Sequence, residues 1–337
     1  MNPPMDFAFI INSPNYSFVA NKYKVAKHLP VSWIKFWCLH WPPVFVSKIS
    51  GLKSVGNNKE VSGCLIGIPM TGDQMLNHRK LAYKRVVQAC KKAERLGVKL
   101  IGLAAFPSYI TKGGTDLKDT IKTPVANGQT LTASTAVDAI EIILNKEKIN
   151  FNQIKIAIVG ATDLVGRGIS KLLATKIPKE LILIGKTPGH LFKLKESIKN
   201  LVPDIELSTS IDITEIKNAE IIIVASASTK IIINPENVKK NAIIYDVSYP
   251  QNVNPNLIKT RPDIKVIDGS LIFTPGINYH FNLGLPKEVV FSCLSETMLL
   301  SSGGIFEDAT GDIDLQNINV VKDLAKYHNF SIYLNIK

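Results

Sequence analysis

Cys293 and Glu296 are the two side chains whose types and spacing most suggest catalysis. They lie in the segment LPKEVVFSCLSETMLLSSGG, residues 285–304. Pro286 suits the first turn of a helix and Gly303 its end, so the sequence predicts a helix with Cys293 about two turns from its start. Residues three apart share a helix face. A thiol and a carboxylate beside a bound nicotinamide could accept an acyl group as a thioester and allow its reduction to an aldehyde. Because this helix is apolar, the same cysteine could instead serve only packing.

The segment KIAIVGATDLVGRGISKLL, residues 155–173, has glycines at the spacing of a phosphate-binding loop. Gly160 ends an apolar run that predicts a strand, and Gly166 would let the next helix, from about Val165, lie close to the sheet. Asp163 stands where the dinucleotide fingerprint has its second glycine, so its carboxylate should repel phosphate unless it turns away to cap the helix. The alternative is an ordinary strand–turn–helix connection. On the first interpretation the cofactor contacts Gly160, Ala161, Thr162, Asp163, Leu164, Val165 and Gly166.

Three apolar runs after this helix predict further buried strands, at residues 180–186, 220–228 and 242–248. Parallel sheets of this kind bind ligands beyond the carboxyl ends of their strands. The sequence therefore predicts an α/β fold, with a Rossmann-type doubly wound parallel sheet preceded by a second α/β substrate domain and followed by a C-terminal helical segment. The cofactor contacts expected at the strand ends are Lys186, Thr187, Ala225, Ser226, Ala227 and Asp246.

The residues after the second of these strands bear on the choice of cofactor. An NAD site would have Asp or Glu there for the ribose hydroxyls, whereas this chain has Lys186 and Thr187, a cation and a donor suited to a 2′-phosphate. NADPH is therefore the expected cofactor, unless Lys186 is simply one of the many surface lysines. Residues 185–187 do not form a P-loop, because Glu180 stands where that motif needs a glycine.

Residues 1–150 predict a domain of their own that would bind the substrate. Its strands are expected at residues 6–12, 60–70, 98–106 and 122–128, and its helices at 75–97 and 131–146. The Rossmann domain is expected at 151–285, and the helical segment with the candidate cysteine at 286–337. Four aromatic residues crowd one stretch, where they would line an apolar acyl pocket or, as we favour, build core: Trp33, Phe36, Trp37 and Trp41.

Composition narrows the functional class. The 337 residues are 45% hydrophobic and 20% charged, which is typical of a folded globular protein. No apolar run reaches the roughly 18 residues of a transmembrane helix, and the start does not read as a signal peptide, so a cytoplasmic protein is expected. Four scattered cysteines predict neither a metal site nor disulfides. The net charge of +12 comes from lysines spread along the chain, which favours an acidic partner or peripheral contact with an anionic membrane over nucleic acid.

Eight segments, in this order, also carry a resemblance: FWCLHWPP (36–43), GCLIGIPMTGDQML (63–76), LGVKLIGLAAFPS (96–108), NGQTLTAS (127–134), VGATDLVG (159–166), YDVSYPQNV (245–253), VIDGSL (266–271) and FSCLSETMLL (291–300). Together they resemble the long-chain acyl-[acyl-carrier-protein] reductases of cyanobacteria. Closer still are their bacterial relatives, which are named shikimate-dehydrogenase-like or amino-acid-dehydrogenase-like. The resemblance covers nearly the whole chain.

In that family a cysteine is acylated by a fatty acyl carrier, and NADPH reduces the thioester to a fatty aldehyde. The resemblance implies that Cys293 is the acyl acceptor and that Glu296 is a nearby acid or orienting group. It also implies that Asp246, Gly269 and Ser270 lie near the nicotinamide, and that the substrate partner is acyl carrier protein or acyl-CoA. The expected substrate contacts are Gly128, Gln129, Thr130 and Thr132.

The chain departs from the family at several positions. Asp163 replaces the middle glycine of the cofactor loop, although methylene-tetrahydrofolate dehydrogenases also lack that glycine and bind a dinucleotide. Leu131 lacks the polar group common at its position. Two alternatives stay open. One is a cysteine-independent dehydrogenase of a small hydroxy or amino acid, which would need a Lys–Asp pair such as Lys122 or Lys80 with Asp138. The other is a non-catalytic NADP-binding or carrier-binding protein.

Overall fold

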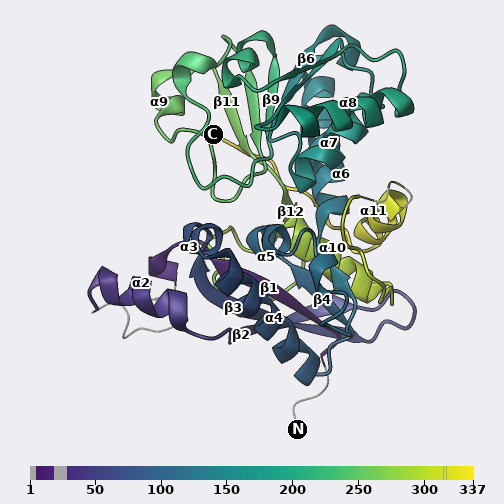
Figure 1. Ribbon diagram of the computed structural model, residues 1–337. Coiled ribbons are helices and arrows are strands. Elements are labelled where there is room, and N and C mark those ends of the chain that lie inside the picture. The colour runs from purple at the N-terminus through teal and green to yellow at the C-terminus, as the bar shows by residue number, and fades with distance from the viewer. Residues whose placement is uncertain (1–4, 19–28, 314, 316) are drawn as a thin grey trace. The chain divides into compact units, whose positions relative to one another are not determined.

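The computed structural model describes residues 5–18, 29–313, 315 and 317–337. The chain forms two compact units (Figure 1). Unit 1 is Met1–Leu131 with Ile272–Ser331, and unit 2 is Thr132–Leu271 with Ile332–Lys337. These boundaries differ from the expected ones at 150 and 285, because the helix before the Rossmann strands belongs mostly to unit 2. Most of the C-terminal segment completes unit 1 and is no separate domain.

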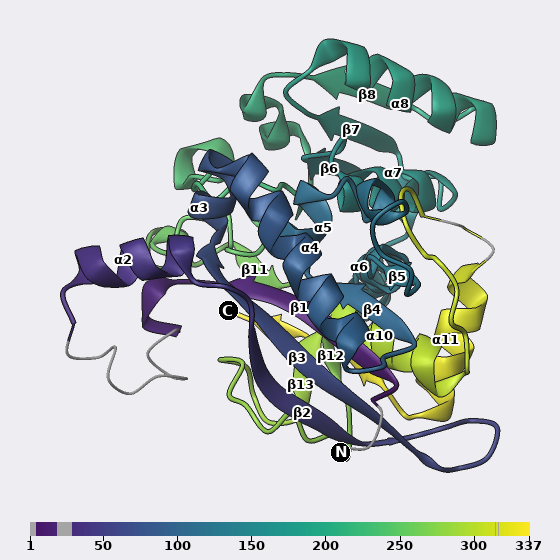
Figure 2. The same ribbon diagram turned by 60° about the horizontal axis from the view of Figure 1, so that its bottom comes forward.

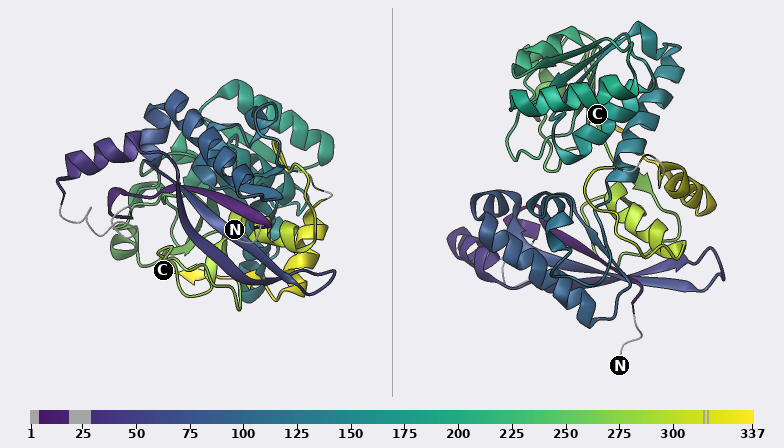
Figure 3. Two further views of the ribbon diagram at one scale, coloured as in Figure 1. Left: turned by 90° about the horizontal axis from the view of Figure 1, so that it is seen from below. Right: turned by 45° about the vertical axis from the view of Figure 1, so that its right-hand side comes forward.

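Unit 2 contains a seven-stranded sheet in the order β15-β11-β10-β9-β6-β7-β8, and its parallel strands are teal and green in Figure 3. Its strands are β6 (Lys155–Val159), β7 (Glu180–Ile184), β8 (Leu207–Ser210), β9 (Ile221–Val224), β10 (Ile243–Asp246), β11 (Lys265–Asp268) and β15 (Asn335–Ile336). All pairs are parallel except β11 with β15. The six parallel strands follow the Rossmann order, with its switch point between β6 and β9. The fold predicted from the apolar runs is confirmed.

The helices of unit 2 are α6 (Gln129–Glu147), α7 (Leu164–Ala174), α8 (Pro188–Leu201) and the short α9 (Leu257–Thr260), with 3-10 turns at Phe151–Gln153, Ile213–Asn218 and Pro235–Asn237. Helix α6 starts in unit 1 and enters unit 2 at Thr132. Near-continuous Ile and Val in the central strands bury both faces of the sheet, as in β9, where all four residues are buried.

Unit 1 contains a five-stranded sheet in the order β2-β3-β1-β4-β5, drawn in purple and blue in Figures 1 and 2. The strands are β1 (Phe7–Ser13), β2 (Val44–Lys53), β3 (Glu60–Thr71), β4 (Leu100–Leu103) and β5 (Val125–Ala126). β2 is antiparallel to β3, and the other pairs are parallel. The accompanying helices are α2 (Val31–His40), α3 (Gly72–Asn77), α4 (Arg79–Arg95) and α5 (Ala105–Ile110), with a 3-10 turn at Thr115–Leu117.

The two faces of this sheet carry different helices. Ile10, Ile66 and Ile101 join one core cluster with the buried residues of α4. The alternate residues face the other way, because side chains in a strand alternate between faces. On that second face a Cβ at Gly102 would meet the Thr297 side chain, so α10 (Ser292–Ser302) lies directly on β4.

A three-stranded sheet and α11 (Asn317–Tyr327) complete unit 1. The strands are β12 (Leu271–Phe273), β13 (Val289–Phe291) and β14 (Ser331–Ile332). The sequence wrongly predicts a helix from Pro286, because Val289–Phe291 extends as a strand and Glu288 has a left-handed φ of 58°. Helix α10 therefore begins at Ser292, and Cys293 lies in its first turn instead of two turns along it.

Two more expectations need correction. The helix predicted over 75–97 is two helices, α3 and α4. His78, with φ −124° and ψ 51°, is not helical and separates them. The aromatic stretch forms α2 and its end, but Trp33, Phe36, Trp37 and Trp41 are neither core nor pocket: they are 40–60% exposed. Within the described residues, no helix is long and apolar enough to cross a membrane.

Candidate functional site

Cys293 lies in the first turn of α10, at the carboxyl edge of the five-stranded sheet. The loop after β5 places Gly128 against it, with a left-handed φ of 71°. A Cβ added at Gly128 would come within 2.3 Å of the Cys293 Cβ and 2.4 Å of its Cα. Only a glycine allows this approach, so the start of α6 and the start of α10 meet at the thiol.

Glu296 lies one turn further along α10 and is 1% exposed. Its Oε2 accepts a hydrogen bond from the Leu131 N–H at 2.6 Å. Thr130 also donates its backbone N–H to this carboxylate. The N-terminal N–H groups of a helix have no partner within the helix, so Glu296 caps α6 from α10. Burial raises the pKa of Glu296 to about 7, against the opposing pull of these N–H donors.

The Cys293 thiol is held in its protonated form. Burial raises its pKa to about 12, and the Glu296 charge acts in the same direction. The backbone N–H groups of Leu294 and Cys293 oppose this shift by hydrogen bonding to the sulfur. A nucleophilic reaction of Cys293 at neutral pH therefore needs a proton acceptor, and Glu296 is a carboxylate one helical turn away whose pKa is near neutral.

Two buried polar side chains near the starts of α6 and α10 lack partners among the described residues, but Ser295, two residues after Cys293, lies on another side of α10 than the thiol. Gln129, the first residue of α6, is 3% exposed, and neither its amide nitrogen nor its amide oxygen has a hydrogen-bond partner. The Oγ of Ser295, in α10, is also buried and unpartnered. Burying polar atoms without hydrogen bonds costs folding free energy. The unpaired amide of Gln129 is therefore typical of a site that binds a polar ligand.

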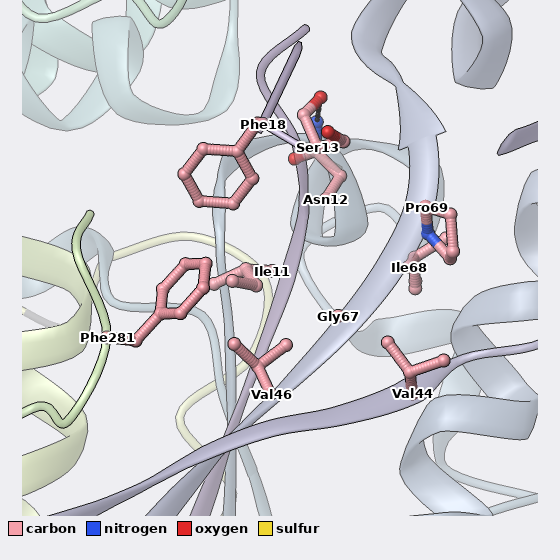
Figure 4. A pocket seen from close by; sticks show the side chains of 10 residues that line it. All are labelled: Ile11, Asn12, Ser13, Phe18, Val44, Val46, Gly67, Ile68, Pro69 and Phe281. Carbon is pink, nitrogen blue, oxygen red and sulfur yellow. Dashed lines mark hydrogen bonds between the residues drawn. The ribbon is translucent and has the colours of Figure 1, made fainter. Parts of the chain in front are cut away.

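An apolar pocket lies on the same face of the sheet as α10 (Figure 4). The pocket is shallow and about half open to solvent, and the enclosed space that could be compared with a closed cavity is about 40 Å³. Its ten lining residues are Ile11, Asn12, Ser13, Phe18, Val44, Val46, Gly67, Ile68, Pro69 and Phe281. The rings of Phe18 and Phe281 meet edge to face at 5.2 Å between centroids. A Cβ at Gly67 would be 2.8 Å from Val46, so the missing side chain opens this space.

The pocket and the thiol share one edge of the sheet as well as one face. Ile11 is on the α10 face because it alternates with Ile10, and it lies at the carboxyl end of β1. Cys293 lies beside Gly128, just past the carboxyl end of the parallel strand β5. Only β4 separates β1 from β5, which is two strand spacings of roughly 5 Å each, and the pocket extends from β1 over β3 and β2. An extended chain attached to the thiol could reach the pocket.

The cofactor loop of unit 2 has the predicted geometry. Gly160 has a φ of 80°, and a Cβ there would meet the Ala225 carbonyl oxygen at 2.8 Å. A Cβ at Gly166 would meet the Gly160 carbonyl oxygen at 2.1 Å. The β6–α7 turn therefore packs against the end of β9 at the topological switch point, with the N–H groups of Leu164 and Val165 in the first turn of α7. This cradle fits a dinucleotide pyrophosphate.

The Asp163 side chain points away from the start of α7, and it does not cap this helix, although the sequence allows that role. It occupies the N-cap position of α7 without a side-chain capping bond. Its Oδ2 instead accepts the Ala227 N–H at 3.0 Å, which ties the β6–α7 loop to the loop after β9. Burial raises the pKa of Asp163, while the Ala227 N–H and the charges of Lys186 and Arg167 lower it. The carboxylate thus stays beside the phosphate cradle without entering the helix N-terminus.

Lys186 and Thr187, the residues predicted to contact a 2′-phosphate, follow β7 at the carboxyl end of the sheet. Both are exposed residues after β7, and Thr187 is the N-cap of α8 without a side-chain capping bond. Ala161 and Thr162 belong to the β6–α7 turn, where the Thr162 carbonyl oxygen accepts a bond from Arg167. The structure thus gathers the glycine loop, Lys186 and the 225–227 loop at one end of the sheet.

Asp246 is placed at the end of β10, but its carboxylate is engaged. Oδ1 accepts from the Ser248 N–H and Oδ2 from the Asn252 N–H, each at 2.9 Å. Burial raises its pKa to about 6. The Ser248 hydroxyl in turn receives a bond from the Ser226 N–H at 3.2 Å. Asp246 therefore organises the loop that follows β10.

Gly269 and Ser270 follow β11 in a tight turn. The Gly269 N–H donates to the Asp246 carbonyl oxygen at 2.7 Å, and a Cβ at Gly269 would meet the Tyr245 ring. Ser270 has a left-handed φ of 60°, and its Oγ is buried without a partner in the described part of the chain. That hydroxyl is therefore available to a ligand at the carboxyl end of the sheet.

The predicted substrate segment divides between the units. Gly128, Gln129 and Thr130 lie in unit 1 beside Cys293 and Glu296, whereas Thr132 is the first residue of unit 2. The pocket residues were missed by sequence reasoning, because they come from three strands and two loops. The small residue Gly67 in a strand is the one signal that marks such an opening. No cluster that could hold a metal ion is found among the described residues.

The residues of the alternative Lys–Asp pair lie in different units. Lys80 is in α4 and Lys122 precedes β5, both exposed and both in unit 1. Asp138 is in the unit 2 part of α6; burial raises the pKa of the Tyr245 hydroxyl, and the Asp138 charge adds to that shift.

The family match covers the middle of the chain, and the sequence relatives cover most of it. Residues 142–268 match the family described as Shikimate / quinate 5-dehydrogenase. The aminotransferase PigE of Serratia sp. is 24% identical over 280 residues, which are 80% of this chain. The chain spans only about a third of that relative's length, 32%. The long-chain acyl-[acyl-carrier-protein] reductase of Synechococcus elongatus is 23% identical over 316 residues, covering 88% of this chain and 89% of the relative.

Solved structures are similar over much of the chain but only loosely. The quinate dehydrogenase of Corynebacterium glutamicum with NAD is 12% identical, with a TM-score of 0.43 over 96% of this chain and 99% of that one. The 5-ketofructose reductase of Gluconobacter sp. is 10% identical, with a TM-score of 0.40 over 96% and 98%. The family match and the similarity to the acyl-carrier-protein reductase support an NAD(P)-dependent oxidoreductase that uses a nicotinamide cofactor.

Proposed function

We propose that this protein reduces acyl thioesters to aldehydes with NADPH, through a covalent acyl group on Cys293. The observation that carries the proposal is the meeting of two helix starts at one thiol. Gly128 brings the start of α6 against Cys293, and Glu296, with a pKa raised to about 7, lies one turn away. The unpaired amide of Gln129 supplies a donor for a carbonyl oxygen at the same place.

The first half of the reaction is acyl transfer. The Cys293 sulfur attacks the thioester carbonyl of acyl carrier protein or acyl-CoA, and its proton passes to the Glu296 carboxylate. The oxyanion that forms is stabilised by the N–H groups at the start of α10 and by the Gln129 amide. The bond to the carrier sulfur then breaks, and the proton on Glu296 leaves with the carrier as a thiol. The products are an acyl-Cys293 thioester and the free carrier.

The second half is reduction of that thioester. When bound, NADPH would supply the hydride that the carbonyl carbon accepts. The chain holds the acyl group on Cys293 while the N–H groups at the start of α10 stabilise the hemithioacetal oxygen. That oxygen then forms the aldehyde carbonyl as the bond to Cys293 breaks, and the departing thiolate takes up one proton from solvent, so the whole reaction consumes one proton. Lys186 and Thr187 would hold the 2′-phosphate that distinguishes NADPH from NADH.

The apolar pocket favours an acyl substrate over a small polar one. Its walls at Ile11, Val44 and Val46 offer burial for a hydrocarbon chain, at roughly 25 cal/mol per Å² of apolar surface. The similarity to an acyl-carrier-protein reductase over 88% of the chain points the same way. The excess of basic residues suits an acidic carrier protein, and we propose that the reaction takes place in the cytoplasm.

A cysteine-independent dehydrogenase of a small hydroxy or amino acid is the second candidate. The match of residues 142–268 to the Shikimate / quinate 5-dehydrogenase family favours it. In that case the Cys293 side chain would only fill space at the start of α10, and hydride transfer would need no covalent adduct. The two candidates therefore differ in what happens when the sulfur is removed.

Steady-state turnover of purified variants separates them. We expect the wild type to oxidise NADPH and to form aldehyde with long-chain acyl-CoA, and Cys293→Ser to lose at least about 100-fold in kcat. Cys90→Ala is the matched control, because Cys90 is a buried thiol on the opposite face of the sheet, in α4. Aldehyde formation by Cys293→Ser at the wild-type rate would refute the covalent mechanism, and oxidation of a hydroxy acid by both variants would establish the second candidate.

A further inference from the structure

Helix α2 exposes an aromatic stripe that no part of the proposed reaction uses. Trp33, Phe36 and Trp37 project from its free side, and Trp41 follows at its end. Trp33 is 59% and Phe36 60% exposed, and Trp37 packs on Trp41 at 6.0 Å between ring centroids. The spacing of three and four residues places these rings along one helix face. Exposed apolar patches of this kind mark interaction surfaces.

Contacts on the other side of α2 fix the position of the aromatic stripe. Ile34 and Cys38, on the opposite side of α2, are buried in unit 1. The Lys35 carbonyl oxygen accepts a bond from the Gln74 side chain at 2.8 Å. The His40 carbonyl oxygen accepts one from Arg85. The helix thus presents its aromatic face as a fixed surface, at one side of unit 1 in Figures 1 and 2.

The helix that anchors α2 is strongly basic. α4 has seven Lys and Arg residues and one Glu, a net charge of +6: Arg79, Lys80, Lys84, Arg85, Lys91, Lys92 and Arg95 against Glu94. Arg79, Lys80 and Lys84 are exposed. Lys92 reaches across to the Pro43 carbonyl oxygen at 3.2 Å, so this charge borders the aromatic stripe.

We propose that this surface, α2 with the basic side of α4, docks on an anionic lipid bilayer. Trp rings favour the boundary between headgroups and acyl chains, and a helix with aromatic residues on one side lies flat in that boundary. Lys and Arg side chains near a negatively charged bilayer add electrostatic attraction to this apolar contact. An acidic protein would match the charge of α4 but would leave an aromatic stripe this large poorly accounted for. The proposal does not depend on the proposed reaction.

Vesicle binding tests the proposal directly, because the three tryptophans of the chain all belong to this surface, at positions 33, 37 and 41. Full-length protein is titrated with phosphatidylcholine vesicles containing 30% phosphatidylglycerol, without NADPH or acyl donor. We expect a blue shift of tryptophan emission and co-sedimentation with the vesicles, both weakened when salt is raised. We expect binding to pure phosphatidylcholine to be about tenfold weaker.

Matched variants distinguish binding through this surface from non-specific adsorption of the protein to vesicles. Trp33→Ser with Phe36→Ser, and separately Lys80→Glu with Lys84→Glu, should each weaken vesicle binding about tenfold. Their controls are Phe192→Ser, which removes a 64% exposed ring on α8, and Lys240→Glu with Lys259→Glu, which reverses two exposed charges of unit 2. These controls should bind like the wild type.

Three outcomes would overturn the proposal. The first is no shift and no co-sedimentation at millimolar anionic lipid. The second is a blue shift that needs acyl carrier protein and not lipid, which would identify a protein-docking surface. The third is a blue shift that depends on protein concentration alone, which would identify contact between copies of this chain.

Discussion

Glu296 combines a structural and a chemical task in one carboxylate. It caps α6 through the Leu131 N–H, and it is the proton acceptor proposed for Cys293. Glu296→Gln keeps an oxygen for the cap but cannot take a proton. We therefore expect this variant to stay folded while acylation slows at least about tenfold. In the wild type the acylation rate should rise as Glu296 ionises near pH 7, and single-turnover assays of Glu296→Gln should lack that rise.

The same raised pKa has a consequence for stability. The folded protein holds a proton on Glu296 up to about pH 7, whereas the ordinary value is 4.5. The stabilisation is therefore complete below about pH 4.5 and is lost as pH rises to about 7. We expect the free energy of unfolding of the wild type, relative to Glu296→Gln, to fall by about 3 kcal/mol over this interval. Urea unfolding at several pH values measures it, and a difference independent of pH would contradict the burial of this carboxyl.

Asp163 sets the charge beside the phosphate cradle. Asp163→Asn keeps an acceptor for the Ala227 N–H and removes the negative charge. We expect it to bind NADPH about fivefold more tightly than the wild type. Because burial raises the Asp163 pKa, wild-type affinity should approach that of the variant as pH falls. Calorimetric titration gives both dissociation constants, and weaker binding by Asp163→Asn would mean that the carboxylate itself helps to form the site.

Lys186 is the residue proposed to distinguish NADPH from NADH. It is an exposed cation after β7, beside the N-terminus of α8. We expect Lys186→Ala to weaken NADPH binding about tenfold and to leave NADH binding nearly unchanged, because only NADPH has a 2′-phosphate. Lys193→Ala, a change of another exposed lysine on α8, is the control. Equal loss of both cofactors in Lys186→Ala would show that this lysine does not read the 2′-phosphate.

At the scale of elements, the contact between the starts of α6 and α10 depends on Gly128. Gly97 is a matched comparison, because it has a similar φ, 74° against 71°, but open space around its Cα. Gly97→Ala should cost about 1 kcal/mol, the conformational penalty alone. Gly128→Ala adds a collision with Cys293 and should cost at least about 2 kcal/mol more, with loss of acylation. Equal costs in urea unfolding would contradict the close contact.

The sequence alone predicts correctly those parts of the fold that depend on short-range patterns of residues. Continuous Ile and Val runs and the Gly160–Gly166 spacing were sufficient for the Rossmann unit, because parallel strands and phosphate loops have short-range signals. The start of α10 was predicted wrongly, since Pro286 is a helix-start signal that the β-branched Val289–Phe291 overrides. The exposure of Trp33 and its neighbours was also missed, because aromatic residues are usually core and only tertiary packing distinguishes the free side of α2.

At the scale of the whole molecule, the proposed site is built from segments far apart in the chain. Gly128 and Cys293 are 165 residues apart, and the partner of the Leu131 N–H, Glu296, is equally distant. No local pattern predicts such contacts, so their geometry comes only from the fold. Helix α6 connects the units covalently, with its start capped in unit 1 and its length in unit 2. The substrate segment at its start is thus continuous with the unit that would bind the cofactor.

The most direct test of the covalent mechanism is the intact mass of the protein after incubation with long-chain acyl-CoA or acyl carrier protein in the absence of NADPH. We expect the wild type to gain the mass of one acyl group, located on the Cys293 peptide and released when NADPH is added. Cys90→Ala should gain the same mass, and Cys293→Ala should gain none. Aldehyde formation by a wild-type enzyme that never carries the acyl mass, or an adduct that persists in Cys293→Ala, would contradict the account.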